Sequence, residues 1–416
     1  MSHLTITGGR VLEGSLRVQG AKNSALPLLA ASVLSEGVSV FRNCPRLTDV
    51  EATVQILRRV GCRVYADGDS LTVDASGPIT PEVPDELMRQ MRSSVIFLGA
   101  LLSRCGEVCL SLPGGCELGP RPVDLHLMAL RSLGAEIREE GGRLCCRAGT
   151  LKGRRIDLPA VSVGATENAM LAAARAEGTT VISGAAREPE ISDLQDYLRD
   201  AGALVSGAGS SVIRIRGVKK LRGAEKRILP DRIVTATYLA AVAAAGGRVR
   251  LYDTDPARCA PVLAALRRMG CEVRTGEGLI LLERREPLRG AGAIITRPYP
   301  GFPTDAQPPL MAAAAGAGGT TVIIETIFES RFRHVPALRA MGADIRTEGK
   351  TAVIRGVEAL HGAEVTAADL RGGAALAVAA LAARGETTLR GMKHILRGYE
   401  DLPGALRALG AEIHYT

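Results

Sequence analysis

The chain has 416 residues, of which 46% are hydrophobic and 23% charged, and this length is enough for two compact domains. No segment is both long and uncharged enough to span a membrane, and the amino terminus lacks the basic-then-apolar pattern of a signal peptide, so we expect a cytoplasmic protein without membrane insertion. The formal net charge of +8 suits anionic ligands, whereas the lack of Trp and an aromatic content of 3% argue against nucleic-acid binding. Nine cysteines, an odd number without a Cys-x-x-Cys pair, and six scattered histidines argue against a disulfide framework and predict no metal site.

A glycine ends an apolar helical stretch at six places along the chain. From Gly61 through Gly134, Gly202, Gly270 and Gly342 to Gly410, successive positions differ by 73, 68, 68, 72 and 68 residues. A period of about 70 is too long for a solenoid of small repeats, and it predicts six supersecondary units of several elements each. Six units in a chain of this length favour two domains of three units.

The third unit gives the expected order of elements most clearly. Its residues predict a strand, an alanine-rich helix, a strand, an amphipathic helix and a closing hairpin at 154–158, 167–176, 179–183, 191–200 and around 207–210. The unit is therefore βαβαββ, in which helices pack on sheets through right-handed crossovers. The alanine-rich helices, such as those at 233–245 and 309–315, are apolar nearly all round and should be buried.

Charged and polar residues precede the alanine-rich helices or occupy their first turns. A helix amino terminus has free N–H groups and a partial positive charge, so a basic side chain there can complete a site for phosphate or carboxylate. Acidic residues there are also common helix caps, and for Asp231 and Asp369 capping explains the residue at least as well as a chemical role. Lys22 gains nothing from a helix start, where its charge is unfavourable, and this favours a role in ligand binding. The set comprises Lys22, Asn23, Arg92, Thr166, Glu167, Asp231, Arg232, Asp305, Gln307, Asp369 and Arg371.

The second unit contains a lengthened loop at residues 113–122. The interval from Gly106 to Gly134 is 28 residues, against 23 to 25 in the other units, and lengthened loops in repeat folds often carry function. Cys116 lies at the tip of this glycine-rich loop, five positions before Arg121, where a reactive thiolate would be favoured. An incidental thiol in a cysteine-rich chain explains the composition equally well.

A second irregular segment runs from Tyr299 to Gln307. Two prolines and a glycine fix its backbone around Asp305, as a positioned general base requires, although tight turns are also fixed for structural reasons. Arg331, Arg333 and Arg397 stand in corresponding loops of the last two units, where guanidinium groups can hold carboxylate and phosphate through paired N–H donors.

Together these segments resemble a known family, the enolpyruvyl transferases of bacterial cell-wall synthesis that act on UDP-N-acetylglucosamine. The similarity runs from end to end of the chain, and it includes Gly-Ala-Lys-Asn at 20–23 and Arg-Gly-Tyr-Glu at 397–400. Its other specific pieces lie at 91–94, 112–116, 119–126, 162–168, 301–307, 328–334 and 369–371.

The resemblance implies an α/β fold with two domains, each an inside-out α/β barrel of three βαβαββ repeats, and an active site in the cleft between them. One domain would comprise residues 20–229 and the other residues 1–19 and 230–416. The family transfers the enolpyruvyl group of phosphoenolpyruvate to the 3-hydroxyl of UDP-N-acetylglucosamine and releases phosphate, the first committed step toward peptidoglycan precursors. No cofactor is implied, both substrates are implied partners, and the sequence assigns no protein partner.

The resemblance also assigns roles to single residues. Lys22, Arg121 and Arg397 would hold the phosphate of phosphoenolpyruvate, and Arg331 and Arg371, with help from Arg397, would hold its carboxylate. Cys116 would protonate the methylene carbon and Asp305 would accept the hydroxyl proton, which gives a tetrahedral ketal that expels phosphate. The implied catalytic residues are Cys116, Asp305, Lys22 and Arg397. The implied substrate-binding residues are Lys22, Asn23, Arg92, Arg121, Pro122, Val123, Asp124, Leu125, Ser162, Val163, Gly164, Asp305, Ile327, Arg331, Arg371 and Arg397.

The chain departs from the family pattern at a few positions. The stretch Val234 to Ala236 lacks the acidic residue and the glycine expected there, Tyr299 replaces a common histidine and Ser330 a common asparagine. Two alternatives stay open: a 5-enolpyruvylshikimate-3-phosphate synthase, which shares fold and chemistry, and a paralogue without turnover. The cysteine loop and the run from Arg121 to Leu125 favour the sugar nucleotide, and retention of Cys116 and Asp305 favours an active enzyme.

Overall fold

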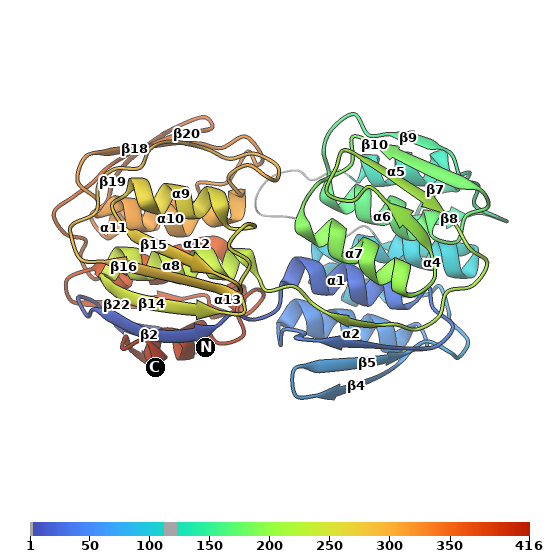
Figure 1. Cartoon of the computed structure of the whole chain (residues 1–416), viewed down its shortest axis with the longest axis horizontal. Helices are drawn as coiled ribbons and strands as arrows, with labels where there is room; N and C mark the ends of the chain where they lie inside the picture. The colour runs from blue at the N-terminus through green and yellow to red at the C-terminus, as the bar shows by residue number, and fades with distance from the viewer. Residues whose placement is uncertain (1–2, 112–122) are drawn as a thin grey trace. The chain divides into compact units, whose positions relative to one another are not determined.

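The computed structural model describes residues 3–111 and 123–416, which form a mixed α/β structure (Figure 1). The predicted roles of Cys116, Arg121 and Pro122 therefore lie outside the described residues. Within these ranges there are five four-stranded sheets and one three-stranded sheet. Each four-stranded sheet combines a parallel pair with antiparallel partners, and the six sheets confirm the six predicted units.

The third unit confirms the predicted order of elements. It runs through β9 (Arg155–Asp157), α6 (Val163–Ala173), β10 (Thr179–Ser183), α7 (Pro189–Asp200), β11 (Leu204–Ser206) and β12 (Val212–Arg216). The predicted start of α6 at residue 167 is four residues late, because the hydroxyl of Ser162 accepts a hydrogen bond from the Ala165 N–H and opens the helix earlier.

The described residues divide into two compact units. Residues 20–111 and 123–229 form the N-terminal unit, and residues 3–19 and 230–416 form the C-terminal unit. Each unit contains three of the six sheets. We describe each unit by itself.

The N-terminal unit is built around alanine- and leucine-rich helices. Helix α4 (Phe97–Cys105) contacts both α1 (Lys22–Ser32) and α6, and α6 is buried from Ala165 to Ala173. The other helical segments are α2 (Thr48–Arg59), α3 (Asp85–Gln90), the 3-10 helix η1 (Arg92–Ile96) and α5 (Asp124–Ser132). The other strands are β3 (Val38–Arg42), β4 (Arg63–Asp67), β5 (Ser70–Asp74), β6 (Glu107–Ser111), β7 (Glu136–Glu140), β8 (Arg143–Arg147) and β13 (Glu225–Arg227).

The C-terminal unit has three buried helices that pack against one another. They are α8 (Arg232–Ala245), α10 (Gln307–Ala315) and α12 (Leu370–Ala382), and the predicted burial of α8 and α10 is confirmed. The other helical segments are α9 (Ala260–Arg268), η2 (Thr304–Ala306), α11 (Val335–Ala340), α13 (Met392–Ile395) and α14 (Leu402–Ala408). The strands after residue 230 are β14 (Gly247–Tyr252), β15 (Glu272–Gly276), β16 (Leu279–Arg284), β17 (Gly292–Ile295), β18 (Thr320–Ile324), β19 (Asp344–Glu348), β20 (Thr351–Arg355), β21 (Glu364–Thr366), β22 (Glu386–Arg390) and β23 (Glu412–Tyr415).

Two strands from the start of the chain complete sheets of the C-terminal unit. Strand β2 (Leu12–Arg17) pairs in parallel with β14, and β1 (Leu4–Thr7) lies between β22 and β23, antiparallel to both. Figure 1 shows this in the colours, since the blue β2 lies beside strands from the second half of the chain.

One cross-strand disulfide joins Cys109 of β6 to Cys145 of β8. The two residues are direct partners in the antiparallel ladder, with Cα atoms 4.0 Å apart. A single bond is not a disulfide framework, but the cysteine count gave no sign of it, because the pairing depends on strand register. In the ranges 3–111 and 123–416 no helix is long and apolar enough to cross a membrane, and no cluster of His, Cys, Asp and Glu could hold a metal ion.

Candidate active site

Three predicted site residues of the C-terminal unit come together around one carboxylate. Asp305 lies in η2, between Pro303 and the start of α10. Its Oδ1 accepts a hydrogen bond of 2.7 Å from Arg331 Nη2, and its Oδ2 accepts one of 3.3 Å from Arg371 Nε. The side chains of Arg331 and Arg371 are 1% and 2% exposed, against 28% for Asp305. The carboxylate therefore bridges two buried guanidinium groups.

Each arginine of this pair is held from a second side. Arg331 donates from Nε and Nη2 to the backbone oxygen of Thr304, and its guanidinium lies 5.6 Å from the centre of the Phe328 ring. The Arg371 guanidinium lies 5.4 Å from the ring centre of Tyr399. Burial opposes the charge of Arg371, but Tyr399 and Asp305 together hold its pKa above the ordinary value. Both cations are thus fixed before any ligand arrives.

Glu325 was missed by the sequence analysis, although it links two predicted site segments. Its Oε1 accepts hydrogen bonds from Thr296 Oγ1, the Ile327 N–H and the Phe328 N–H, at 2.9, 2.7 and 3.2 Å. Its Oε2 accepts one of 2.9 Å from Thr304 Oγ1, in the turn of Asp305. Glu325 is only 1% exposed, and it fixes the backbone on which Ile327 and Asp305 stand. The only sequence signal was an acidic residue directly after the buried strand β18.

Asp231 and Asp369, for which the sequence left capping and a chemical role both open, are both helix caps. Asp231 accepts hydrogen bonds from the N–H groups of Ile233 and Val234 at the start of α8. Asp369 Oδ1 does the same for Arg371 and Gly372 at the start of α12. Capping by Asp369 also fixes the backbone that carries Arg371.

Arg397 lies half-buried in the loop between α13 and α14. Gln19 holds this loop, because its side chain donates to the Gly398 carbonyl at 3.3 Å and accepts from the Glu400 N–H at 3.0 Å.

In the N-terminal unit, Lys22 is the first residue of α1. Its Nζ lies 3.1 Å from Asp49 Oδ2 of α2, and the two side chains are 12% and 4% exposed. This ion pair offsets the unfavourable charge of Lys22 at the helix start. No pattern in the sequence predicted the pair. Asn23, the next residue, is exposed.

The other predicted residues of this unit gather near His126, which was not predicted as a site residue. Gly164, in the first turn of α6, faces the ring, since a Cβ there would lie 2.9 Å from His126 Cε1. The charge of Arg92 lowers the pKa of this ring and that of Asp124 raises it, and Leu125 directly precedes His126 in α5. The structure thus brings the starts of α5, α6 and η1 to one histidine. Val123 directly precedes α5, and Ser162 and Val163 precede Gly164.

A hydrogen-bond network fixes the tautomer of His126. Asn168 Oδ1 accepts from the Gly99 N–H at 2.7 Å, so its Nδ2 is the donor to Val95 O at 3.0 Å and to His126 Nδ1 at 2.7 Å. The ring proton therefore resides on Nε2, which would lie 3.2 Å from a Cβ added at Gly164. Burial, together with the charge of Arg92, lowers the pKa of His126 to about 4.

This buried neutral histidine predicts a pH-dependent stability. The unfolded chain takes up a proton at His126 near pH 6.5, but the native ring does not do so above a pKa of about 4. Its contribution to the free energy of unfolding is therefore full above pH 6.5 and is lost as the pH falls toward 4, by at most about 1.4 kcal/mol per pH unit. Urea unfolding at pH 7 and pH 5 should show a smaller loss for His126→Gln than for the wild type. Equal losses in the two proteins would contradict this reading.

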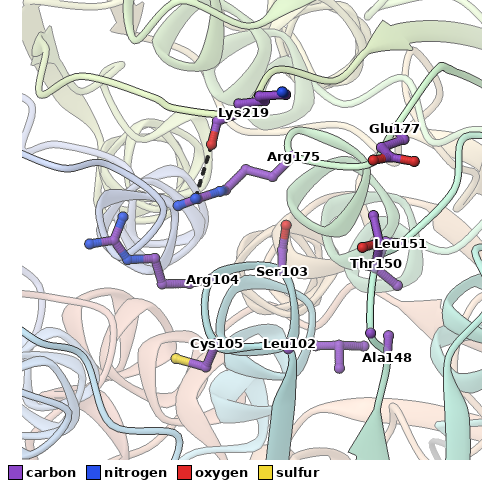
Figure 2. A pocket seen from close by; sticks show the side chains of 12 residues that line it. Leu102, Ser103, Arg104, Cys105, Ala148, Thr150, Leu151, Arg175, Glu177 and Lys219 are labelled. Carbon is purple, nitrogen blue, oxygen red and sulfur yellow. Dashed lines mark hydrogen bonds between the residues drawn. The ribbon is translucent and has the colours of Figure 1, made fainter.

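The described residues of the N-terminal unit also line a cavity of about 340 Å³ at the ends of α4 and α6 (Figure 2). Arg104, Arg175 and Lys219 line it, and none of the predicted site residues does. Arg104 and Arg175 share the carboxylate of Glu36, at 3.1 and 3.5 Å, and Figure 2 shows Arg175 reaching the backbone oxygen of Lys219. Arg104 and Arg175 lie at the carboxyl ends of α4 and α6, where positive charge stabilises the fold. We therefore place the active site elsewhere.

Comparison with known proteins decides the family. A model of the EPSP synthase (3-phosphoshikimate 1-carboxyvinyltransferase) family matches residues 6–406. The chain belongs to the enolpyruvyl transferase family. Two curated relatives of this enolpyruvyl transferase bear the name UDP-N-acetylglucosamine 1-carboxyvinyltransferase. The protein of Caldanaerobacter subterraneus subsp. tengcongensis, numbered 2, is 48% identical and that of Dichelobacter nodosus 46%, each over 99% of both chains.

Solved structures confirm the fold of this enolpyruvyl transferase. The enolpyruvyl transferase NikO from Streptomyces tendae matches with a TM-score of 0.90 and 30% identity, over 100% of this chain and 99% of that one. The EPSP synthase of Acinetobacter baumannii matches with a TM-score of 0.77 and 22% identity over 100% of both chains, which concerns the fold alone. The predicted fold class, the α/β fold of enolpyruvyl transferases, is confirmed.

Proposed function

We propose that this protein transfers the enolpyruvyl group of phosphoenolpyruvate to the 3-hydroxyl of UDP-N-acetylglucosamine and releases phosphate. The observation that carries the proposal is the identity of 46–48%, over nearly the whole chain, to relatives named UDP-N-acetylglucosamine 1-carboxyvinyltransferase. In the cell the reaction would commit the sugar nucleotide to peptidoglycan synthesis, and we place it in the cytoplasm. A shikimate 3-phosphate acceptor is the alternative, supported by the family name but opposed by an identity of only 22% to a solved EPSP synthase.

Arg331 and Arg371 are proposed to bind the carboxylate of phosphoenolpyruvate. In the structure both guanidinium groups bind Asp305. A carboxylate between two guanidinium groups is a poor base, because both cations favour its ionised form. We therefore assign an exchange in which the substrate carboxylate replaces Asp305 between the arginines. The freed Asp305 then accepts the proton of the sugar hydroxyl.

The remaining roles follow the family resemblance. Lys22, Arg121 and Arg397 hold the phosphate, whose charge they neutralise as it becomes the leaving group. Cys116 delivers a proton to the methylene carbon, and the sugar oxygen then attacks the neighbouring carbon. The remaining contacts to the sugar nucleotide are assigned to Asn23, Arg92, Pro122, Val123, Asp124, Leu125, Ser162, Val163, Gly164 and Ile327.

The proposed function is tested by phosphate release from phosphoenolpyruvate with each acceptor in turn. We expect release with UDP-N-acetylglucosamine and none with shikimate 3-phosphate. The opposite preference would show a shikimate enzyme, and no release with either acceptor would favour a paralogue without turnover.

Selective alkylation of Cys116 is a second expected result. Burial raises the pKa of Cys62, Cys146, Cys259 and Cys271 to about 11 or 12 and also raises that of Cys105. Cys44 is buried, and Cys109 and Cys145 are joined in the disulfide. A phosphonate epoxide that mimics phosphoenolpyruvate should therefore label Cys116 alone after brief exposure, because thiolates and not thiols are nucleophilic. Peptide mass spectrometry gives the site, with Cys116→Ser as the control. Label spread over the other cysteines would refute the assignment.

A further inference from the structure

Several buried polar atoms without hydrogen-bond partners surround the arginine pair. Among the described residues they include both ring nitrogens of His334, Oδ2 of Asp369 and Nη1 of Arg371. Buried polar atoms are nearly always paired in native proteins, so a group of unpaired ones indicates a missing partner such as a ligand, a water or a proton. These atoms belong to the starts of α11 and α12, next to the residues that bind Asp305.

His334 and Asp369 face the same small space. His334 directly precedes α11 and is 2% exposed. A Cβ added to Gly372 would lie 3.0 Å from Asp369 Oδ2 and 3.0 Å from His334 Cβ. Asp369 Oδ1 is occupied by the N–H groups of Arg371 and Gly372, which leaves Oδ2 for the side of the histidine.

Two arginines and two carboxylates surround the imidazole of His334. Arg331 and Arg371 supply two positive charges, and Asp305 and Asp369 supply two negative ones. Burial and the charge of Arg331 lower the pKa of the imidazole to about 4, while Asp369 and the backbone of Arg331 act in the opposite direction. An anion bound by these arginines would bring a further negative charge close to Asp305 and Asp369, and the imidazole of His334 is a neutral base that can offset it.

We propose that His334 is a further residue of the anion site, and that its imidazole takes up a proton from solvent when the carboxylate of phosphoenolpyruvate binds Arg331 and Arg371. The inference rests on the proposed function. A new N–H bond forms on the ring and no other bond changes. The imidazolium can then donate to Asp369 Oδ2, which gives a partner to two of the unpaired groups. His334 acts here as a positioning residue, because it faces Asp369, which caps the helix that carries Arg371, and not the reacting atoms.

Histidine NMR measures this proton directly. The ring Cε1–H signal of His334 is assigned by its loss in His334→Gln, and its titration is followed with and without saturating phosphoenolpyruvate. We expect its midpoint to rise on binding, while that of the exposed His361, in the same unit, stays unchanged. An unchanged midpoint for His334 would overturn the inference.

Steady-state kinetics give a second readout that a purely structural histidine would not move. Because only the wild type takes up the proton, the ratio of KM for phosphoenolpyruvate between His334→Gln and wild type should grow as the pH falls from 8 to 6, by up to about tenfold per unit. The control His361→Gln should keep a ratio near one. If this KM ratio does not change with pH, His334 has only a packing role and the inference is wrong. Loss of turnover in the wild type would instead overturn the proposed function and this inference with it.

Discussion

Replacing Asp305 with asparagine should lower turnover by roughly a hundred- to ten-thousand-fold, the usual range for loss of a general base. The same change should strengthen the binding of phosphoenolpyruvate, because the amide no longer competes with the substrate carboxylate for Arg331 and Arg371. Single-turnover kinetics separate the chemical step from binding, and titration calorimetry gives the affinity. Asp305→Asn should thus lower turnover and raise the affinity for phosphoenolpyruvate.

Asp253→Asn is the matched control for this variant. Asp253 also binds an arginine of the C-terminal unit, Arg17 at 3.0 Å, and its backbone φ of 57° suits asparagine. It should change neither turnover nor affinity. Near-normal turnover in Asp305→Asn would mean that the carboxylate only shapes its turn and that the hydroxyl proton leaves by another route.

Lys22→Ala should weaken phosphoenolpyruvate binding by roughly ten- to a hundredfold, the value of about 1.5–3 kcal/mol for one charge-assisted contact. Turnover at saturating substrate should fall less than in Asp305→Asn, because a binding charge and not a proton acceptor is lost. KM and kcat for phosphoenolpyruvate, measured at saturating sugar nucleotide, check this.

The ion pair of Lys22 with the buried Asp49 complicates this variant, because the alanine also removes a partner of that carboxylate. Lys22→Ala should therefore also lower the melting temperature. The double variant Lys22→Ala with Asp49→Asn should recover stability but not affinity. If the double variant binds phosphoenolpyruvate as well as the wild type, the lysine is structural only.

The order of elements could be predicted because the signal is local. The glycine period gave six units, and uniformly apolar stretches such as that of α10 gave the buried helices. Both open cap assignments, at Asp231 and Asp369, also depended on residues only two or three positions away.

The contacts that define the candidate site could not be predicted in this way. Asp305 binds partners 26 and 66 positions away, and Glu325 holds a turn 21 positions before it. The pair of Asp305 with Arg371 depends on how neighbouring repeats pack, and the other two pairs depend on how loops far apart within one repeat meet. The resemblance supplied Arg331 and Arg371, but it gave no hint that Asp305 binds both in the absence of ligand.

The place of β1 and β2 has a consequence for synthesis on the ribosome. The hydroxyls of Thr5 and Thr416 lie 3.0 Å apart although the residues are 411 positions apart. Both strands emerge early, yet their sheets cannot close until β14, β22 and β23 have been translated, whereas every strand of the N-terminal unit is available once β13 has emerged. The unit that starts second in the sequence should thus fold first, while the earliest strands wait with unpaired edges. Nascent chains arrested when β13 has emerged but β14 has not should yield a protease-resistant fragment of residues 20–229 and leave residues 3–19 open to cleavage.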